Sequence, residues 1–159
     1  MGIKEAIKQS TFRSSRQKAM LNMLYTHNWM LQHIRGFMAG ANLTHQQYNV
    51  LRILRGSHPN PLSTLQIRDR MLDKMSDTSR IVDRLIKKKL VKKTACENDR
   101  RLVDIAITTQ GMAVLQELDG REQELDELLG GLSESEAETL SALLDKLRAT
   151  KEEKEPTPK

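Results

Sequence analysis

Apolar residues recur at helical spacing from Ser15 to Gly40. Their separations alternate between four and three residues, and the seam consists of Met20, Leu24, His27, Leu31, Ile34 and Met38. A second stripe on a neighbouring face has a spacing of seven and consists of Met23, Met30 and Phe37. A helix that is apolar over so wide an arc needs cover on more than one side. The pattern predicts one long helix, either central to the core or shared between two subunits.

Three shorter helices are predicted in the next part of the chain. Thr44 and Ser63 are each followed three residues later by glutamine, which is the pattern of a capping box at a helix N-terminus. Pro59 and Pro61 lie between the two capping boxes and prevent one continuous helix from spanning both of them. Ser76 is expected to cap the third helix, which should run to about Lys89. The residues expected on the buried faces are Tyr48, Val50, Leu51, Leu54, Leu65, Ile67, Met71, Leu72, Val82, Leu85 and Ile86.

The pattern then changes to the two-residue period of strands. Apolar and polar residues alternate over 103–107, a short strand is expected at 90–95, and a polar, turn-like segment lies between them. These features predict a β-hairpin with a basic tip. After Thr108 the helical period returns, with a break at Gly130-Gly131, and the charged tail at 151–159 is expected to be disordered.

The order of these elements predicts a mainly helical fold with a minor β component. A short helix, a tight break, a second helix and a hairpin form a winged helix-turn-helix, which we place at residues 41–107. This lobe is too small to cover the apolar seams on either side of it. We therefore expect residues 15–40 and 108–150 to form a helical dimerisation region, covered by its own helices and by a second copy of the chain.

The net charge of +5 is unevenly distributed along the chain. Residues 1–40 carry a net +5 and residues 41–107 a net +7, whereas residues 108–159 carry a net −7. A basic face turned towards nucleic acid, with an acidic remainder turned elsewhere, produces this asymmetry. Double-stranded DNA is the predicted partner.

Composition excludes several other classes of protein. Aromatic residues make up only 3% of the chain, so a core of Leu, Ile, Val and Met is expected. No stretch approaches the ~20 apolar residues that cross a bilayer, and no secretory signal is recognisable. A single cysteine excludes an internal disulfide framework. We expect a cytoplasmic protein without membrane contact.

The marks of an enzyme are also missing from the sequence. The four histidines show no metal-ligand spacing, and there is no phosphate-binding glycine loop or nucleophile motif. Neither a metal nor a cofactor is therefore expected. A winged-helix module that binds protein instead of DNA is the remaining alternative, and its wing and recognition helix would lack arginine.

Candidate DNA contacts gather on the second helix of the motif and on the hairpin tip. The helix carries hydroxyl and guanidinium groups near its N-terminus, followed by Arg84 and Lys87, which suit base edges and phosphates. The lysine run at 87–89 also complements the helix dipole, and a solvated helix end is its alternative interpretation. At the hairpin tip, Asp99 can orient a neighbouring guanidinium by a bidentate pair, so that an arginine enters a narrow minor groove.

These segments resemble the MarR (multiple antibiotic resistance regulator) family. The resemblance rests on Ser79-Arg80-Ile81-Val82-Asp83-Arg84-Leu85, the Lys-Lys-Lys-Leu-Val that follows, Asp99-Arg100-Arg101, and Ile107-Thr108-Thr109-Gln110-Gly111. It covers residues 15–148 of the 159-residue chain, and the spacing from helix to wing is preserved. Two positions depart from the family pattern: Lys89 replaces the usual glycine at the end of the recognition helix, and Ile107 replaces the usual leucine.

The resemblance implies a homodimeric, sequence-specific transcription regulator that binds a pseudo-palindromic operator. The N-terminal helix and the two C-terminal helices form the interface, recognition helices enter successive major grooves, and wings enter the flanking minor grooves. By position, the residues facing the major groove are Ser76, Thr78, Ser79, Arg80 and Arg84. The contacts to the backbone at the start of the shorter helix are Ser63, Thr64 and Gln66. At the wing, Arg101 enters the minor groove and Arg100 lies near phosphate.

The same resemblance implies a repressor that a small aromatic or anionic ligand releases from DNA. His27 and Trp29, on the first long helix, are candidate ligand contacts, with ordinary packing and surface roles as the alternative. Cys96, in the hairpin, is either an oxidant-sensing thiol activated by Lys92 and Lys93 or an incidental one. No second cysteine is present to resolve an internal disulfide.

Overall fold

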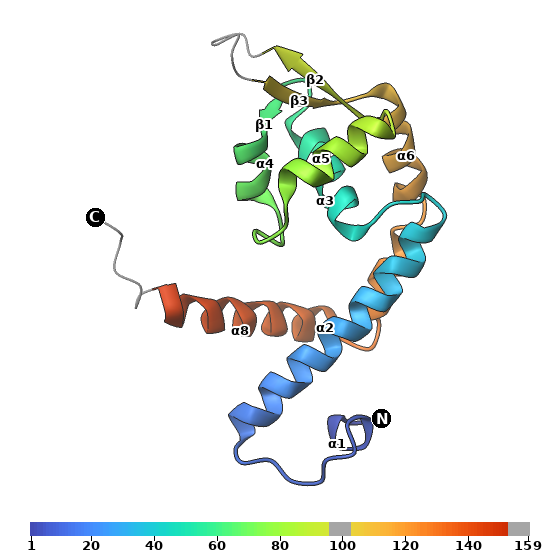
Figure 1. Cartoon of the computed structure of the whole chain (residues 1–159). Coiled ribbons are helices and arrows are strands. Elements are labelled where there is room, and N and C mark those ends of the chain that lie inside the picture. Colours follow the sequence, from blue (N-terminus) through green and yellow to red (C-terminus); the bar gives the residue numbers. More distant parts are fainter. Residues whose placement is uncertain (96–102, 153–159) are drawn as a thin grey trace, which may run out of the picture. The chain divides into compact units, whose positions relative to one another are not determined.

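The computed structural model describes residues 1–95 and 103–152 (Figure 1). In chain order, its elements are α1 (Ile3–Ala6), α2 (Ser15–Ala39), α3 (His45–Ser57), β1 (Leu62–Ser63), α4 (Thr64–Arg70), α5 (Thr78–Lys87), β2 (Val91–Ala95), β3 (Val103–Ile107), α6 (Thr109–Asp119), α7 (Gln123–Asp126), the 3₁₀ helix η1 (Glu127–Leu129) and α8 (Glu134–Glu152). The chain divides into two compact units, Met1–Glu122 and Gln123–Lys159. The predicted fold class, mainly helical with a small sheet, is confirmed. Of the tail predicted to be disordered at 151–159, the first two residues belong to α8 instead, and the rest lies outside the described residues.

The strands form one antiparallel sheet in the order β1-β3-β2. β2 and β3 pair as the predicted hairpin, with Val91 opposite Ile107. β1 pairs with the other edge of β3 and places Leu62 opposite Ile105. The sequence analysis misses β1, because two residues are too short to establish an alternating pattern.

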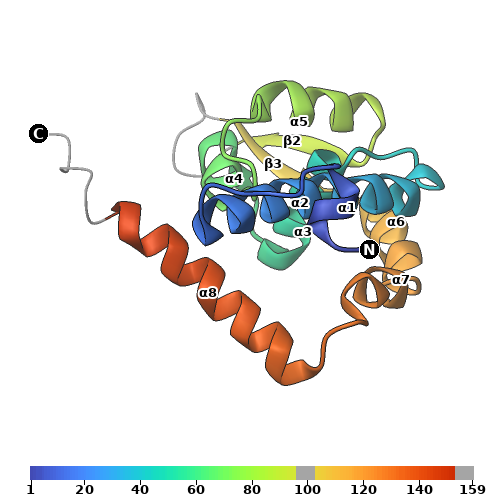
Figure 2. The same cartoon turned by 90° about the horizontal axis from the view of Figure 1, so that it is seen from below.

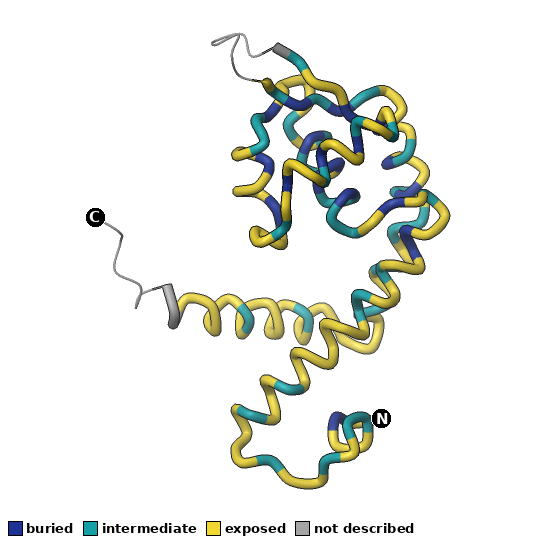
Figure 3. The backbone as a smooth tube through the Cα atoms, viewed as in Figure 1, coloured by how far each residue is buried: buried dark blue, intermediate teal, exposed yellow. Residues whose placement is uncertain are grey.

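The core of the first unit lies between this sheet and the surrounding helices, where the dark positions of Figure 3 gather. The almost fully buried side chains are Met38, Val50, Leu51, Leu54, Ile67, Leu85, Val91, Ile105, Leu115 and Leu118. Every one of them is aliphatic or methionine, as the low aromatic content predicts. Their burial supplies the main apolar stabilisation of the lobe.

Two leucines that we expect in the core lie on the surface instead. Leu65 is 56% exposed and Leu72 is 92% exposed. Leu65 is two positions from the buried Ile67, and two helical positions differ by roughly 200° around the axis. Leu72 follows the end of α4 at Arg70 and belongs to a turn. The prediction is wrong for both residues, since the short α4 buries a single side chain of its own.

Side-chain caps fix where two of the helices begin. Both predicted capping boxes are complete, Thr44 with Gln47 at α3 and Ser63 with Gln66 at α4. In each box the hydroxyl accepts from a backbone N–H while the glutamine carbonyl accepts from the N-cap residue. The sequence therefore predicts both of these helix starts correctly.

The start of α5 differs from the prediction. Its N-cap is Asp77, whose carboxylate accepts from the backbone N–H of Arg80 at 3.1 Å. Ser76 donates its hydroxyl to the Asp73 carboxylate instead of capping the helix. The expectation that Ser76 caps α5 is wrong, because the cap is Asp77 and the helix begins at Thr78.

α2 is a single long helix, as predicted, but it is buried only near its C-terminus. Phe37 and Met38 lie in the lobe, whereas Leu24 is 55% exposed. α1 packs against α2 and buries Ile3 (Figure 2). The N-terminal half of the α2 seam, at Met20, Leu24 and His27, is therefore exposed.

The second unit consists of α7, η1 and α8. Three of the four leucines of α8 are likewise exposed, with Leu143 at 59% and Leu140 and Leu147 at lower values (Figure 3). Among the described residues, no helix is both long and apolar enough to cross a membrane. Each unit thus carries a helix with exposed apolar side chains.

Candidate nucleic-acid interface

α5 has one buried face and one exposed face. Val82 and Leu85 pack into the core. Arg80, Arg84 and Lys87 are exposed, and their spacing of four and three places them on one side of the helix. Within residues 1–95 and 103–152, none of these three side chains makes a hydrogen bond or an ion pair. The lobe therefore presents an unpaired cationic helix face.

A hydrogen-bonded turn joins α4 to α5. Asp73 accepts from the Ser76 hydroxyl at 2.7 Å and from the Met75 N–H at 3.1 Å. These two hydrogen bonds lower the pKa of the Asp73 carboxyl. The N–H of Leu72 donates to the Asn49 side chain of α3 at 3.0 Å. The turn thus connects the recognition helix to the body of the lobe, in the helix-turn-helix arrangement that the sequence predicts.

One hydroxyl predicted to face the major groove is buried. Thr78 is 4% exposed, and its hydroxyl lies 3.4 Å both from the Met71 sulfur and from the Ser76 carbonyl oxygen. Thr78 precedes the buried Val82 by four residues, so both lie on the inner face of α5. The expectation that Thr78 faces the groove is therefore wrong. Ser79, one residue later, is exposed.

Lys89 ends the recognition helix in a left-handed conformation, with φ of 60°. Its N–H donates to the Ile86 carbonyl at 2.8 Å, and the N–H of Leu90 donates to the Leu85 carbonyl at 3.1 Å. These two hydrogen bonds form a Schellman motif, in which the left-handed residue is usually glycine. The departure noted in the sequence does not change the geometry of the helix end, but it places a side chain where glycine is favoured.

The N-terminus of α6 packs directly against this helix end. A Cβ added at Gly111 would fall well inside the contact distance of the Leu90 carbonyl oxygen and 2.8 Å from Cγ1 of Ile107. Glycine is therefore required by the close approach of α6 to the backbone after α5. The Thr-x-x-Gly spacing in the resemblance has a physical cause here, since Thr108 caps α6 by accepting from the Gly111 N–H.

The base of the wing is basic. Lys92 and Lys93 are exposed on β2, and the Lys93 ammonium lies 3.9 Å from the Asp83 carboxylate of α5. The wing tip holds the predicted residues Cys96, Asp99, Arg100 and Arg101, which lie outside the described residues. β3 resumes at Val103, which is about half exposed.

The start of α4 carries the residues expected to contact the DNA backbone. Ser63 and Thr64 are partly exposed and Gln66 is exposed. The Ser63 hydroxyl and the Gln66 carbonyl are used in the capping box. The Gln66 amide nitrogen and the Thr64 hydroxyl have no hydrogen bond in the described part of the chain, and both remain candidate contacts.

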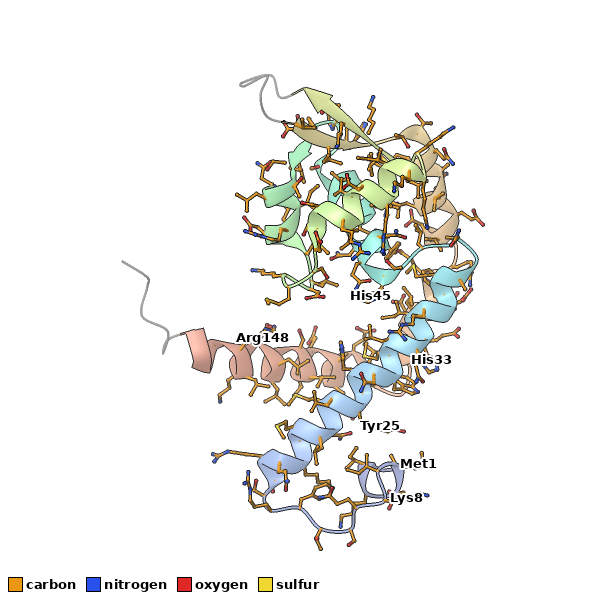
Figure 4. The ribbon with its side chains drawn as sticks, viewed as in Figure 1. Met1, Lys8, Tyr25, His33, His45 and Arg148 are labelled. Atoms are coloured by element: carbon orange, nitrogen blue, oxygen red, sulfur yellow. The ribbon has the colours of Figure 1, made fainter. Side chains whose placement is uncertain are left out.

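The candidate ligand residues lie on the exposed part of α2. The Trp29 ring contacts that of His33, with centroids 4.4 Å apart. Figure 4 shows His45 at the start of α3, on the side of the lobe towards α2. Burial is the main cause that lowers the pKa of His45, followed by the charge of Arg35; Asp73 opposes them with a smaller effect, and His27 has the smallest lowering effect. The described residues hold no group of His, Cys, Asp and Glu that would bind a metal ion.

A contact between α5 and α3 escapes the sequence analysis. Lys88 donates to the carbonyl oxygen of Asn42 and, at 3.3 Å, to the side-chain oxygen of Gln47. In the sequence, Lys88 is one of three consecutive lysines, and Gln47 has a capping role only. No local pattern distinguishes the lysine that turns inward from its two neighbours.

Comparisons with known proteins agree with this geometry. A model of the MarR family matches residues 41–102, which include the helix-turn-helix and the first strand of the hairpin, β2. The HTH-type transcriptional regulator PrsX of Escherichia coli is 31% identical over 121 residues, covering 76% of this chain and 73% of PrsX. The chain belongs to the MarR family. As a MarR-family transcription regulator it binds DNA, which confirms the predicted class and excludes the enzyme alternative.

Solved structures support the fold of this MarR-family protein. A MarR transcription factor from Planctomyces limnophilus is 34% identical, with a TM-score of 0.64, and the match covers 85% of this chain and 98% of that one. BpsR of Bordetella bronchiseptica, whose DNA binding is regulated by 6-hydroxynicotinic acid, matches with a TM-score of 0.75 at 23% identity. That match covers 87% of this chain and 98% of BpsR. At this identity the likeness to BpsR concerns the fold alone.

Proposed function

We propose that this MarR-family protein is a homodimeric repressor that binds a pseudo-palindromic operator and is released by a small ligand. The observation that carries the proposal is the exposed face of α5, formed by Ser79, Arg80, Arg84 and Lys87. The opposite face is held in the core, so the cations project from a fixed helix. A helix of this kind fits the major groove, where arginine recognises guanine by two parallel hydrogen bonds.

Contacts on either side of α5 would complete the interface. We assign backbone contacts to Ser63, Thr64 and Gln66 at the start of α4. We assign the minor groove to Arg101, oriented by Asp99, and a phosphate to Arg100. The exposed lysines at the base of the wing extend the basic surface towards that tip. Specificity then comes from the recognition helix and the wing, and the backbone contacts set the register.

The dimer is supported by the uncovered apolar side chains of α2 and α8. Met20 and Leu24 on α2, and Leu143 and Leu147 on α8, are all at least half exposed in the single chain. Burying one leucine side chain contributes about 1.5–3 kcal/mol. Several such side chains in a two-fold interface would stabilise a permanent dimer, with its recognition helices about one helical turn of DNA apart, ~34 Å.

Ligand release is supported by the chemistry beside His27 and Trp29. Trp29 offers an exposed aromatic surface and Arg35 offers a positive charge, while the His45 ring, whose lowered pKa favours its neutral form, offers a hydrogen-bonding group. An aromatic acid would suit these groups. BpsR, which shares the fold, is regulated by such a compound. We place the repressor in the cytoplasm, where it would block transcription until its ligand accumulates.

Fluorescence anisotropy with duplexes selected from a random pool tests the DNA-binding proposal. We expect wild-type affinity to fall by about 10³-fold or more between ~50 and ~200 mM salt. Arg84→Ala should weaken binding at least ~10-fold, whereas Lys18→Ala, which removes an exposed cation at the start of α2, should not. Equal effects of the two variants would contradict the assigned face.

A reporter assay tests the sign of regulation. The selected duplex is placed at a promoter, and we expect transcription to fall when the protein is present. Arg84→Ala should restore transcription, and Lys18→Ala should not. Increased transcription with wild-type protein would contradict repression.

A further inference from the structure

A cavity of about 510 Å³ lies where the end of α2 and the loop after it approach the C-terminal half of α5. Its polar lining comes from Asn42, Thr44, Gln47, Arg84, Lys87 and Lys88. No acidic residue is among the described residues that line it. Three cations from the last turns of one helix therefore meet polar groups of another part of the lobe, without a counter-charge.

Gln47 supplies an unused donor to this cavity. Its side chain is 4% exposed, and its oxygen accepts from the Thr44 N–H at 3.1 Å and from the Lys88 ammonium at 3.3 Å. Both neighbours are donors, so they fix the amide with its oxygen towards them and its NH₂ group away from them.

The NH₂ group of Gln47 has no hydrogen-bond partner in the described part of the chain. No buried side-chain nitrogen or oxygen there lacks a partner. The NH₂ group is therefore not sealed inside the lobe, and the cavity is the open space that Gln47 lines.

The three cations differ in how firmly they are held. Lys88 is fixed by the carbonyl oxygen of Asn42, in addition to its bond with Gln47. Arg84 and Lys87 have no hydrogen bond or ion pair within the described residues, and their side chains are exposed. Two unpaired cations beside an amide donor and an ammonium group that are already hydrogen-bonded suit an oxyanion, which accepts several hydrogen bonds at once.

We propose that this cavity is an oxyanion site that binds a phosphate group. The Gln47 NH₂ group and the Arg84 and Lys87 side chains would donate to the phosphate oxygens. The phosphate group has two sources, a backbone phosphate of bound DNA or a free phosphate ion. Only the first source rests on the proposed function, because a free ion would bind in the absence of DNA.

Titration of inorganic phosphate into the DNA-free, full-length protein tests the site. Ionic strength is held constant with sodium chloride, and the side-chain NH₂ signals of Gln47 are followed by NMR. We expect a saturable shift of these signals, and about tenfold weaker binding in Lys87→Gln. Lys18→Gln, which removes a distant exposed lysine, should bind phosphate as the wild type does. A linear, non-saturating response, or equal weakening in the two variants, would overturn the proposal.

Repeating the titration with the selected duplex bound distinguishes the two sources. A bound duplex that blocks the shift identifies the occupant as a DNA phosphate, and Lys87→Gln should then lower the slope of log K against log salt by about 1. A shift that persists with the duplex bound identifies a free ion. If the protein bound no duplex, the first titration would still decide whether the site exists.

Discussion

The hydroxyl oxygen of Thr108 lies 2.8 Å from the carbonyl oxygen of Lys89, and the two residues join the start of α6 to the end of α5. The same hydroxyl lies 3.0 Å from the Leu90 carbonyl oxygen and accepts from the Gly111 N–H at 3.1 Å. The Thr108 N–H also donates to Leu90 at 3.0 Å. Both strands of the wing lie between these points in the chain, so this junction links the recognition helix, the wing and α6.

Gly111→Ala tests the junction. The new Cβ would collide with the Leu90 carbonyl and with Ile107, whose Cγ1 would lie 2.8 Å away. Forcing extra atoms into a packed site costs about 1–3 kcal/mol of unfolding free energy. Urea denaturation followed by circular dichroism measures this loss.

Gly56→Ala is the matched control for that substitution. Gly56 lies in the last turn of α3, and a Cβ there would meet nothing within 4 Å. Alanine at such a helical position should raise the free energy of unfolding by about 0.5–1 kcal/mol. If the two variants were equally stable, the close packing at Gly111 would not be the constraint described above.

Lys89→Gly should stabilise the protein. Lys89 has φ of 60°, a conformation that disfavours residues with a Cβ, so we expect a gain of about 1 kcal/mol. Lys87→Gly removes a similar exposed lysine two residues earlier, within the regular helix, and should cost about 0.5–1 kcal/mol. Thermal denaturation without DNA compares the two. Changes of the same sign in both variants would contradict the assigned helix end.

Asp119→Asn should destabilise the protein at neutral pH. Arg55 of α3 donates to both carboxylate oxygens of Asp119 on α6, at 2.5 and 3.0 Å. The hydrogen bond from Arg55 is the main cause that lowers the pKa of Asp119 below 3.8. Because the pair is partly exposed, its contribution is about 0.5–1 kcal/mol.

The pH dependence of that loss follows from the direction of the shift. A carboxyl whose pKa is lower in the folded state stabilises the fold above its unfolded pKa and loses this effect as the pH falls through its folded pKa. The difference between wild type and Asp119→Asn should therefore shrink below pH 3.8. Glu138→Gln, which removes an exposed carboxylate of α8, should show little difference at either pH. A constant difference between acid and neutral pH would exclude the ion pair as its source.

Leu24→Glu and Leu143→Glu should each weaken the proposed dimer. A carboxylate in an apolar interface loses its hydration, so we expect a shift towards monomer at micromolar concentration. Leu65→Glu is the control, since Leu65 is 56% exposed, close to the 55% of Leu24, but lies on α4. Analytical ultracentrifugation measures the association. A monomeric wild type would contradict the dimer directly.

The parts of the fold with local signals could be predicted from the sequence. A hydroxyl and a glutamine three residues apart specify the starts of α3 and α4, because the capping contacts lie within one turn. The hairpin follows from the alternation of 103–107. The start of α5 could not be predicted in this way, since Ser76 and Asp77 are both good caps and only the bond from Ser76 to Asp73 decides between them.

The choice between Ser76 and Asp77 as the cap of α5 also decides which side chains of that helix face outward. With the cap at Asp77, Thr78 falls on the inner face of α5 and Ser79 on the outer face. Contacts between distant segments were also beyond sequence reasoning. Arg55 and Asp119 are 64 residues apart, and no local sequence pattern around either residue indicates that they form an ion pair. The cationic positions Arg80 and Arg84 were predicted correctly as exposed, because they oppose the apolar Val82 and Leu85 at helical spacing.

The Schellman motif after α5 has a consequence for how such a regulator changes its target. Only Leu90 separates Lys89 from β2. The Thr108 hydroxyl lies within hydrogen-bond distance of the backbone carbonyl groups of both Lys89 and Leu90. The start of the wing is therefore fixed relative to the last turn of the helix. A new DNA sequence preference can arise by exchange of the outward-facing side chains of α5. Inserting or deleting a residue between α5 and β2 would instead change the position of the wing relative to the helix, so that the two could no longer contact their grooves together.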